Sequence, residues 1–127
     1  IHAGWRGTVK RIVEKTLDKM AALYGTKGED VQAYIGPGIS LNAFEVGDEV
    51  YEAFEAAGFD MACIARRDEK WHLDLWEANR IQLLSKGVKK ENVEVTGICT
   101  YQNYTDFFSA RRLGIRSGRI LSGIMRM

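Results

Sequence analysis

The stretch VQAYIGPG, residues 31–38, places a short run of β-forming side chains directly before a Gly-Pro-Gly turn. Such a run predicts a strand that ends in a tight turn. The residues before it repeat apolar side chains at helical spacing, with Thr8 as the expected N-cap and Gly25 as the stop. These apolar side chains are Val9, Ile12, Val13, Leu17, Met20 and Leu23. The first third of the chain is therefore expected to be a helix followed by a strand.

Downstream of residue 38, helical and strand patterns continue to alternate. The expected elements are a helix over 46–57 closed by Gly58, a hairpin from 61–66 and 71–75, a helix over 75–85, a strand over 93–99, a short helix over 105–112 and a last strand over 119–125. This order predicts an α/β fold, a layered α/β sandwich with a mixed sheet, because the hairpin is antiparallel.

Composition narrows the class of protein. The chain has 127 residues, of which 46% are hydrophobic and 28% charged, values close to those of ordinary globular domains. The formal net charge of +1 excludes a bulk electrostatic field that recruits nucleic acid or membrane. Apolar runs are far shorter than the roughly 18–20 residues that cross a bilayer. We expect one soluble folding unit with neither nucleic acid nor a membrane as partner.

The two ends and the cysteines bear on cellular context. The chain opens with Ile1 and His2 and has neither an initiator Met nor a signal peptide, so we expect a fragment of a longer chain. Cys63 and Cys99 lie far apart, which favours free thiols in a reducing compartment, and a single disulfide is the alternative. The expected localisation is cytoplasmic.

The segment from His2 to Thr8 is the first candidate for a functional site. Two glycines flank Trp5 and Arg6 just before a helix, so the backbone is able to approach a ligand while Arg6 and the helix N-terminus attract an anion. His2 suits a metal ligand or an acid/base group. Spacing alone favours the alternative, a simple helix cap at a frayed end, because one histidine does not define a metal site.

Two further segments carry reactive or recognition side chains. Cys99 follows a predicted buried strand, where α/β folds place ligands, but it lacks the basic neighbour that activates a thiol, so spacing favours a buried, unreactive group. Phe108 is able to stack on a base, and Arg111 and Arg112 suit phosphate or carboxylate. An equally good interpretation of this segment is a helix that buries aromatic rings and solvates its arginines.

Together these segments resemble the YfiH family of laccase-domain proteins, also called polyphenol oxidases. The motifs that carry the resemblance are His2 to Thr8; Ile35-Gly36-Pro37-Gly38-Ile39 with Phe44-Glu45-Val46-Gly47; Leu73-Asp74-Leu75 with Asn79; Cys99-Thr100; and Phe108-Ser109 with Arg111-Arg112 and Gly118-Arg119. They stand in the family's order and span essentially all of residues 1–127, which match the C-terminal portion of a single YfiH-like domain. Leu113 departs from the family pattern, in which an acidic residue often follows the double arginine.

The resemblance implies a zinc-dependent purine nucleoside phosphorylase that acts on adenosine, inosine and methylthioadenosine and also deaminates adenosine. It implies a His-Cys-His zinc site in which His2 is one ligand, with the other two upstream of this chain. Zinc would activate a water for deamination, and an arginine would hold phosphate during phosphorolysis. We expect Arg6 and Cys99 to be catalytic. Residues expected to bind substrate are Arg6, Phe108, Arg111 and Arg112.

Two other functions compete with this expectation. A copper-dependent polyphenol oxidase, or laccase, would need several histidine ligands, and the chain offers only His2 and His72. A non-catalytic module would use basic ends to hold a nucleotide or an acidic partner, since residues 1–20 carry five basic and two acidic groups and 41–60 carry six acidic and no basic groups. The expected partners are a purine nucleoside and phosphate, and the expected state is a monomer.

Overall fold

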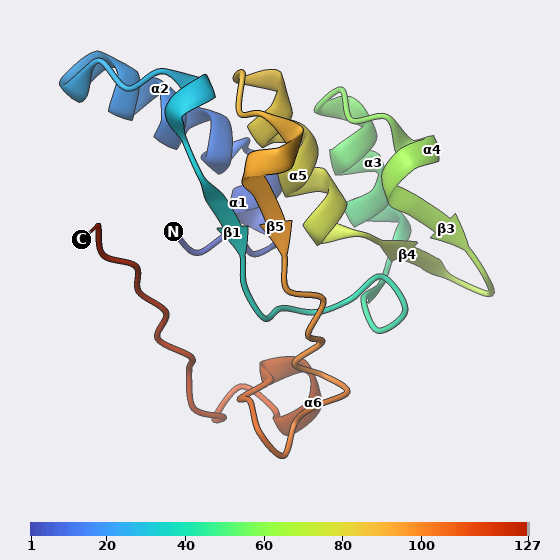
Figure 1. Cartoon of the computed structure of the whole chain (residues 1–127). Coiled ribbons are helices and arrows are strands. Elements are labelled where there is room, and N and C mark those ends of the chain that lie inside the picture. The colour runs from blue at the N-terminus through green and yellow to red at the C-terminus, as the bar shows by residue number, and fades with distance from the viewer. Residues whose placement is uncertain (127) are drawn as a thin grey trace.

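The computed structural model describes residues 1–126, which form small helices around two separate sheets (Figure 1). The helices are α1 (Trp5–Val9), α2 (Ile12–Tyr24), α3 (Asp48–Ala56), α4 (Met61–Ile64), α5 (Leu75–Ser85) and α6 (Ala110–Leu113), with 3₁₀ turns at Gly28–Asp30 and Lys90–Asn92. The strands are β1 (Ala33–Ile35), β2 (Glu45–Val46), β3 (Ala65–Arg67), β4 (Trp71–Leu73) and β5 (Val93–Val95).

Parallel and antiparallel pairings occur in different sheets. Strands β1 and β5 pair in parallel with Ala33 opposite Val93, and β2, β4 and β3 form an antiparallel sheet in that order. The expected α/β class is confirmed, but the single mixed sheet is divided into two. Both strands of the parallel sheet are short. Beyond residues 35 and 95 the pairing continues through the N–H of Thr96, which donates to the carbonyl of Ile35 at 3.0 Å, and through a bridge between Gly38 and Cys99.

Helix α5 connects the two apolar cores of the molecule. Its first half contributes Leu75 and Ala78 to a cluster around Phe54, which also holds the side chains of α3 and the antiparallel sheet. Its second half contributes Leu83 to a smaller cluster with Val13 of α2, against which the inward side chains of β1 and β5 pack. Helices α2 and α5 therefore cover one face of the parallel sheet.

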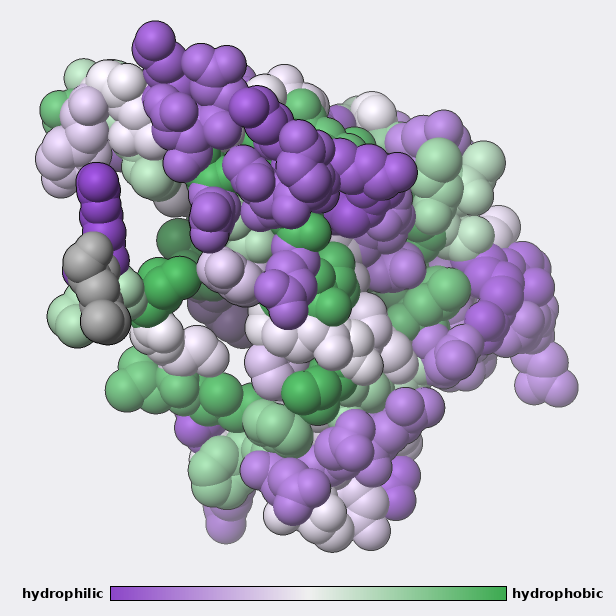
Figure 2. Space-filling model, viewed as in Figure 1, coloured by the Kyte–Doolittle hydropathy of each residue, from purple (hydrophilic) through white to green (hydrophobic). Residues whose placement is uncertain are grey.

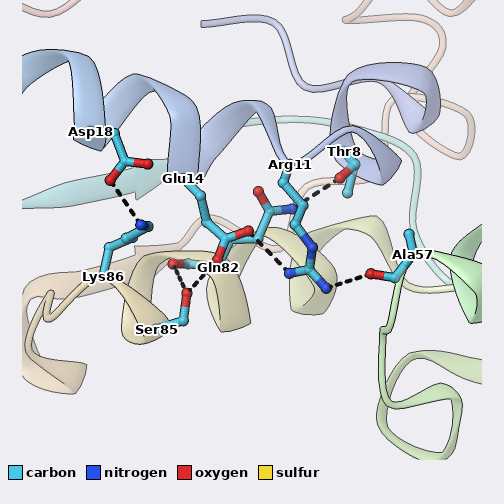
Figure 3. A network of polar contacts seen from close by, with 8 residues as sticks. All are labelled: Thr8, Arg11, Glu14, Asp18, Ala57, Gln82, Ser85 and Lys86. Atoms are coloured by element: carbon cyan, nitrogen blue, oxygen red, sulfur yellow. Dashed lines mark hydrogen bonds and ion pairs between the residues drawn. The ribbon is translucent and has the colours of Figure 1, made fainter.

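The single helix expected to start at Thr8 is instead two helices. Arg11 has a left-handed backbone with φ 58°, which separates α1 from α2 and costs a non-glycine residue about 1–2 kcal/mol. The Arg11 guanidinium offsets this cost, because it pairs with Glu14 at 3.0 Å and donates to the carbonyl of Ala57 at 2.9 Å (Figure 3). It also lies over the ring of Phe59. These long-range partners override the continuous helical spacing.

Thr8 is consequently not the N-cap that the spacing predicts. It lies inside α1, fully buried, and its hydroxyl donates to the carbonyl of Ala3 at 3.0 Å. Gln82 of α5 donates to the carbonyl of Thr8 at 3.1 Å (Figure 3). The other end of the expected helix is confirmed, because Gly25 closes α2 in a left-handed conformation with φ 65°.

Several predicted boundaries in the middle of the chain are confirmed and others shift. The helix over 75–85 has the predicted bounds, with Asp74 capping it by accepting from the N–H of Glu77. The helix expected over 46–57 begins at Asp48, because Val46 is in β2. The predicted hairpin is present as β3 and β4, but its expected first residues form α4, where Asp60 caps the N-terminus.

The C-terminal part differs most from expectation. The strand expected over 119–125 is absent, and these residues are extended without a ladder partner within the described chain. The helix expected over 105–112 is reduced to α6, and the strand expected over 93–99 is reduced to β5. Within residues 1–126, no helix combines the length and apolarity that a membrane span requires.

Candidate active site

A hollow of about 470 Å³ lies where α1, β2, α3, the β3–β4 hairpin and α6 meet. It is lined by Trp5, Phe44, Glu45, Val46, Gly47, Glu49, Val50, Lys70 and Arg111. The two lining residues farthest apart in sequence, Trp5 and Arg111, belong to motifs separated by more than one hundred residues. Aromatic, acidic and basic side chains thus share one concave surface, which is typical of a small-molecule site.

The floor of the hollow is held by buried residues of the main core. Phe44 and Val46 are buried, and β2 pairs with β4 through Glu45 opposite His72. Gly47 follows β2 and precedes α3, and a Cβ at this position would collide with the carboxylate of Glu49. A glycine is therefore required for Glu49 to fold back toward the hollow.

Arg111 reaches the hollow from the other end of the chain. Its guanidinium donates to the carbonyl of Glu45 at 2.9 Å and lies 5.2 Å from the centre of the Phe44 ring. Ser109 begins the short helix α6, since its hydroxyl accepts from the N–H of Arg112 at 3.4 Å. One hydrogen bond and one cation–π contact thus dock the α6 segment on the floor of the hollow.

The two other arginines expected at the site are engaged elsewhere. Arg6 is exposed on the solvent side of α1, where it lies over the ring of Trp5, 4.5 Å from its centre, and it is not among the lining residues. Arg112 lies over the rings of Tyr101 and Tyr104. Contact with the phenol of Tyr101, and to a smaller extent with that of Tyr104, raises the pKa of the Arg112 guanidinium. Only Arg111 among the expected arginines lines the hollow within residues 1–126.

Phe108 and Cys99 also lie outside the lining of the hollow. Phe108 is exposed, and its ring covers Gly118 so closely that a Cβ there would collide with it. Cys99 is buried, and its Sγ accepts from the hydroxyl and the N–H of Ser40 at 3.2 and 3.4 Å. Burial opposes ionisation of Cys99, but the Ser40 hydroxyl and nearby backbone N–H groups outweigh it and lower the pKa of the thiol.

Ser40 was not foreseen as a partner of Cys99. The chain positions the two residues together through the parallel bridge between Gly38 and Cys99. No local signal in the sequence identifies Ser40, because the pair is separated by 59 residues. The Cys99 thiol is thus polarised by the Ser40 hydroxyl and by backbone N–H groups, and not by a basic side chain.

His2 is exposed and its ring lies over the backbone of Gly4. A Cβ at Gly4 would be 2.9 Å from the Nε2 atom of His2, so a side chain at Gly4 would push the imidazole away. Within residues 1–126 there is no group of three or more His, Cys, Asp or Glu side chains arranged to hold a metal ion. His2 alone therefore does not make a metal centre in this chain.

A buried polar network connects the His2 segment to α5. The Asn79 amide donates to the hydroxyl of Thr8 at 3.2 Å, and that hydroxyl donates to the carbonyl of Ala3, the residue after His2. Both Thr8 and Asn79 are buried. Sequence reasoning named Asn79 but missed Gln82, although a polar residue on the inward face of α5 is a usable signal.

The remaining histidine and the tryptophans have structural partners. The Nδ1 atom of His72 lies 3.0 Å from the carbonyl of Leu41, and its Nε2 atom lies 3.7 Å from Asp68. Trp71 stacks on Tyr51 with ring centres 3.9 Å apart. These contacts give His72 and Trp71 structural roles.

Comparison with known proteins identifies relatives of the whole chain. A family model described as "Multi-copper polyphenol oxidoreductase laccase" matches residues 1–127. A "Purine nucleoside phosphorylase" of Bacteroides thetaiotaomicron is 63% identical over 98% of this chain and 47% of its own length. "Adenosine deaminase RL5" of an unknown prokaryotic organism is 46% identical over 98% of this chain and 48% of its own length.

Solved structures agree with these matches. The crystal structure of the hypothetical protein YfiH of Bacillus licheniformis superposes with a TM-score of 0.80 at 31% identity, over 87% of this chain and 43% of that one. YlmD of Geobacillus stearothermophilus gives a TM-score of 0.79 at 33% identity, over 87% of this chain and 42% of that one. The chain spans about half the length of the curated relatives it matches.

Proposed function

The chain belongs to the multi-copper polyphenol oxidoreductase laccase family, and on this premise we propose that it is part of a zinc-dependent purine nucleoside phosphorylase that also deaminates adenosine. The names of the two relatives described above support both activities. The proposed substrates are a purine nucleoside, such as adenosine, inosine or methylthioadenosine, and phosphate.

The observation that carries the proposal is the convergence of three distant motifs on one hollow. Trp5 comes from the first motif, Phe44 to Gly47 from the second and Arg111 from the last. Convergence of this kind is expected of a binding site, because a purely structural role for each motif does not require a shared cavity. The hollow's volume of about 470 Å³ lies in the range of small-molecule pockets, roughly 300–1,000 Å³.

The lining residues supply what a nucleoside and phosphate require. The half-buried ring of Trp5 offers an apolar face for a purine. Glu45 and Glu49 offer acceptors for ribose hydroxyls, and Lys70, paired with Glu45 at 3.3 Å, adds a cation. Arg111 is exposed, always charged and held in the lining by its hydrogen bond to the carbonyl of Glu45, so we assign it the role of binding phosphate.

In phosphorolysis the bond between the ribose C1′ and the purine N9 breaks, and a phosphate oxygen forms the new bond to C1′. The purine leaves with the bonding electrons and takes up a proton. Arg111 would hold the attacking phosphate close to C1′ and balance its charge. Arg6 would act indirectly, by fixing the Trp5 ring through the contact between them.

Zinc is the proposed metal, with His2 as one of its ligands. The described residues do not by themselves fit a zinc ion, since no three suitable donors gather in residues 1–126. The remaining ligands would come from outside residues 1–126. His72 is a poor candidate for a copper ligand, because both of its ring nitrogens already face oxygen atoms.

The direct test is to incubate adenosine and phosphate with the longer, zinc-loaded protein of which this chain is proposed to be a part. Adenine with ribose 1-phosphate reports phosphorolysis, and inosine reports deamination. We expect Arg111→Ala to lower phosphorolysis by about 100-fold, the size of effect seen when a charged donor is removed from a transition state. The matched control is Arg116→Ala, an exposed arginine outside the hollow, which is expected to leave the rate unchanged.

Two results would contradict the proposal. Oxidation of phenols that depends on copper, without turnover of nucleosides, would favour a laccase. Equal losses of activity in Arg111→Ala and Arg116→Ala would show that the hollow does not hold phosphate.

A separate measurement tests binding of the purine. Adenosine should quench tryptophan fluorescence, and this quenching should disappear in Trp5→Phe if the purine lies on the Trp5 ring.

A further inference from the structure

Helix α1 carries one wall of the hollow but is too short to hold its own position. It has five residues, and no side chain caps its first turn at Gly4. Isolated helices shorter than about 12 residues are marginal in water, so α1 depends on the helices that it contacts, α2 and α5. Because Trp5 is the first residue of α1 and lines the hollow, the contacts that fix α1 also fix the Trp5 ring.

Two amide side chains of α5 hold α1 at a single residue, Thr8. The Asn79 amide donates to the hydroxyl of Thr8 at 3.2 Å, and the Gln82 amide donates to its carbonyl at 3.1 Å. In the view of Figure 2, hydrophilic residues cover most of the upper part of the molecular surface. Asn79 and Gln82 are polar residues of the interior instead, since they are 6% and 0% exposed.

Stability alone does not explain these two amides. Within residues 1–126, neither Oδ1 of Asn79 nor Oε1 of Gln82 has a hydrogen-bond donor. Turning the Asn79 amide over would place its oxygen against the carbonyl of Leu75, which now accepts from its Nδ2 atom at 2.8 Å. A buried acceptor without a donor destabilises the folded state, and an apolar side chain would avoid that cost. The amides are therefore best explained by what their N–H groups hold.

The Thr8 hydroxyl passes the hold of Asn79 to the residue before Gly4. A threonine hydroxyl inside a helix usually bonds to a carbonyl of the preceding turn. Here the backbone N–H of Thr8 takes the carbonyl of Gly4 at 2.8 Å, and the hydroxyl reaches the carbonyl of Ala3, outside α1, at 3.0 Å. Without Asn79 the hydroxyl could turn to Gly4, and the Ala3 carbonyl would lose its donor.

Gln82 acts on the opposite end of α1. The Thr8 carbonyl to which it donates also accepts from the backbone N–H of Arg11 at 2.9 Å. That carbonyl keeps a donor when Gln82 is replaced, and it lies after Trp5 in the chain. Asn79 and Gln82 therefore share a helix, a partner and deep burial, but only Asn79 is connected to the turn that leads into Trp5.

We propose that Asn79 is a positioning residue for the nucleoside. It acts through the Thr8 hydroxyl on the carbonyl of Ala3, and so keeps the Trp5 ring in place in the wall of the hollow. Asn79 is not itself among the lining residues. The inference rests on the proposed function, in which the purine lies on the Trp5 ring.

The first test measures kinetics in the longer, zinc-loaded protein, with rates normalised to zinc content. Asn79→Leu should raise KM for adenosine about tenfold, the effect of one buried hydrogen bond, and leave kcat nearly unchanged. KM for phosphate should not change, because Arg111 is held by the carbonyl of Glu45. Gln82→Leu is the matched control and should leave KM for adenosine unchanged. Equal rises in the two variants would overturn the proposal.

A double-mutant cycle tests whether Asn79 and Thr8 form one link. Thr8→Val should raise KM for adenosine about as much as Asn79→Leu does, and the double variant should be no worse than either, because the same link is broken twice. Thr8→Ser keeps the hydroxyl and should behave like the unchanged protein. A double variant whose KM rises by the product of the two single effects, about 100-fold, would show that the residues act separately and would overturn the proposal.

A measurement on the Trp5 ring separates this inference from the proposed function. Fluorotryptophan is incorporated into the longer protein, and the fluorine NMR signal of Trp5 is assigned by its loss in Trp5→Phe. We expect Asn79→Leu and Thr8→Val to shift or broaden that signal, and Gln82→Leu and Thr8→Ser to leave it in place. An unchanged Trp5 signal in Asn79→Leu would overturn the inference even in an active enzyme. A shifted signal in a protein that does not act on nucleosides would support the link from Asn79 to Trp5 and contradict the proposed function.

Discussion

Residues 5–88 and residues 97–126 contain similar fractions of large apolar side chains but use them differently. In the first region Phe54 and Leu73 are completely buried between helices and the antiparallel sheet. In the second region Leu121 and Ile124 face solvent, and α6 is held by the contacts of single side chains. The comparison shows that apolar pattern alone does not produce structure, because a strand or helix also needs a surface to pack on.

The largest contrast should appear in stability. Leu73→Ala removes a fully buried side chain from the main core and should lower the free energy of unfolding by about 2–5 kcal/mol. Leu121→Ala should change it by less than about 0.5 kcal/mol, because that side chain is exposed. Urea denaturation followed by circular dichroism measures both. A comparable loss in Leu121→Ala would mean that the second region is packed in solution like the first.

A smaller effect should come from the polar network under α1. Thr8→Val removes the hydroxyl that links Asn79 to the carbonyl of Ala3 and should cost about 1–3 kcal/mol, since both groups lose a partner in a buried place. Thr8→Ser keeps the hydroxyl and should recover most of the loss.

The counterpart of Thr8 in the second region is Ser109, whose hydroxyl caps α6. Ser109→Ala should leave global unfolding nearly unchanged and only increase hydrogen exchange at residues 110–114, because no side chain of α6 belongs to either apolar core. The same denaturation experiment distinguishes the two sites. If Ser109→Ala destabilises the chain as much as Thr8→Val, the two regions fold as one.

The smallest expected effect concerns pH. Arg80, by hydrogen bonding to Glu77, lowers the pKa of that carboxylate below its ordinary value, while partial burial acts in the opposite direction. A lowered pKa in the folded state adds stability that is present above the unfolded pKa and is lost as pH falls through the folded one. Glu77→Gln should therefore reduce stability by about 0.2–1 kcal/mol near neutral pH and leave it unchanged at acid pH.

Asp106→Asn provides the control for the second region. Asp106 makes no ion pair within residues 1–126, so its replacement should not lower the free energy of unfolding near neutral pH. Unfolding measured at several pH values between about 3 and 7 checks both variants. If both variants flattened the dependence of the free energy of unfolding on pH equally, the contact of Glu77 with Arg80 would not be its cause.

The elements predicted correctly are those whose local and tertiary signals agree. Helix α5 has an apolar face, the cap Asp74 and cores on both sides, so its bounds follow from the sequence. The expected cap at Thr8 is wrong because its real partners, Asn79 and Gln82, lie more than seventy residues away. The expected strand over 119–125 is absent because no neighbouring strand is available to it.

The candidate site was predictable in part for the same reason. The motifs around Trp5, Phe44 and Arg111 were recognised, but only the fold shows that these side chains line one hollow. Spacing does not reveal that Arg6 and Arg112 are occupied by aromatic neighbours. The roles of His2, Arg6, Cys99, Phe108, Arg111 and Arg112 remain predictions, and the Arg111→Ala measurement tests one of them.

Helix α5 has a further effect on how the molecule opens. Leu75 belongs to one apolar cluster and Leu83 to the other, and the helix between them is continuous. Loss of either cluster would strip one half of α5 of its packing and weaken the hydrogen bonds of the other half. The two clusters should therefore melt in a single cooperative step, with α5 as the last element to exchange its amides.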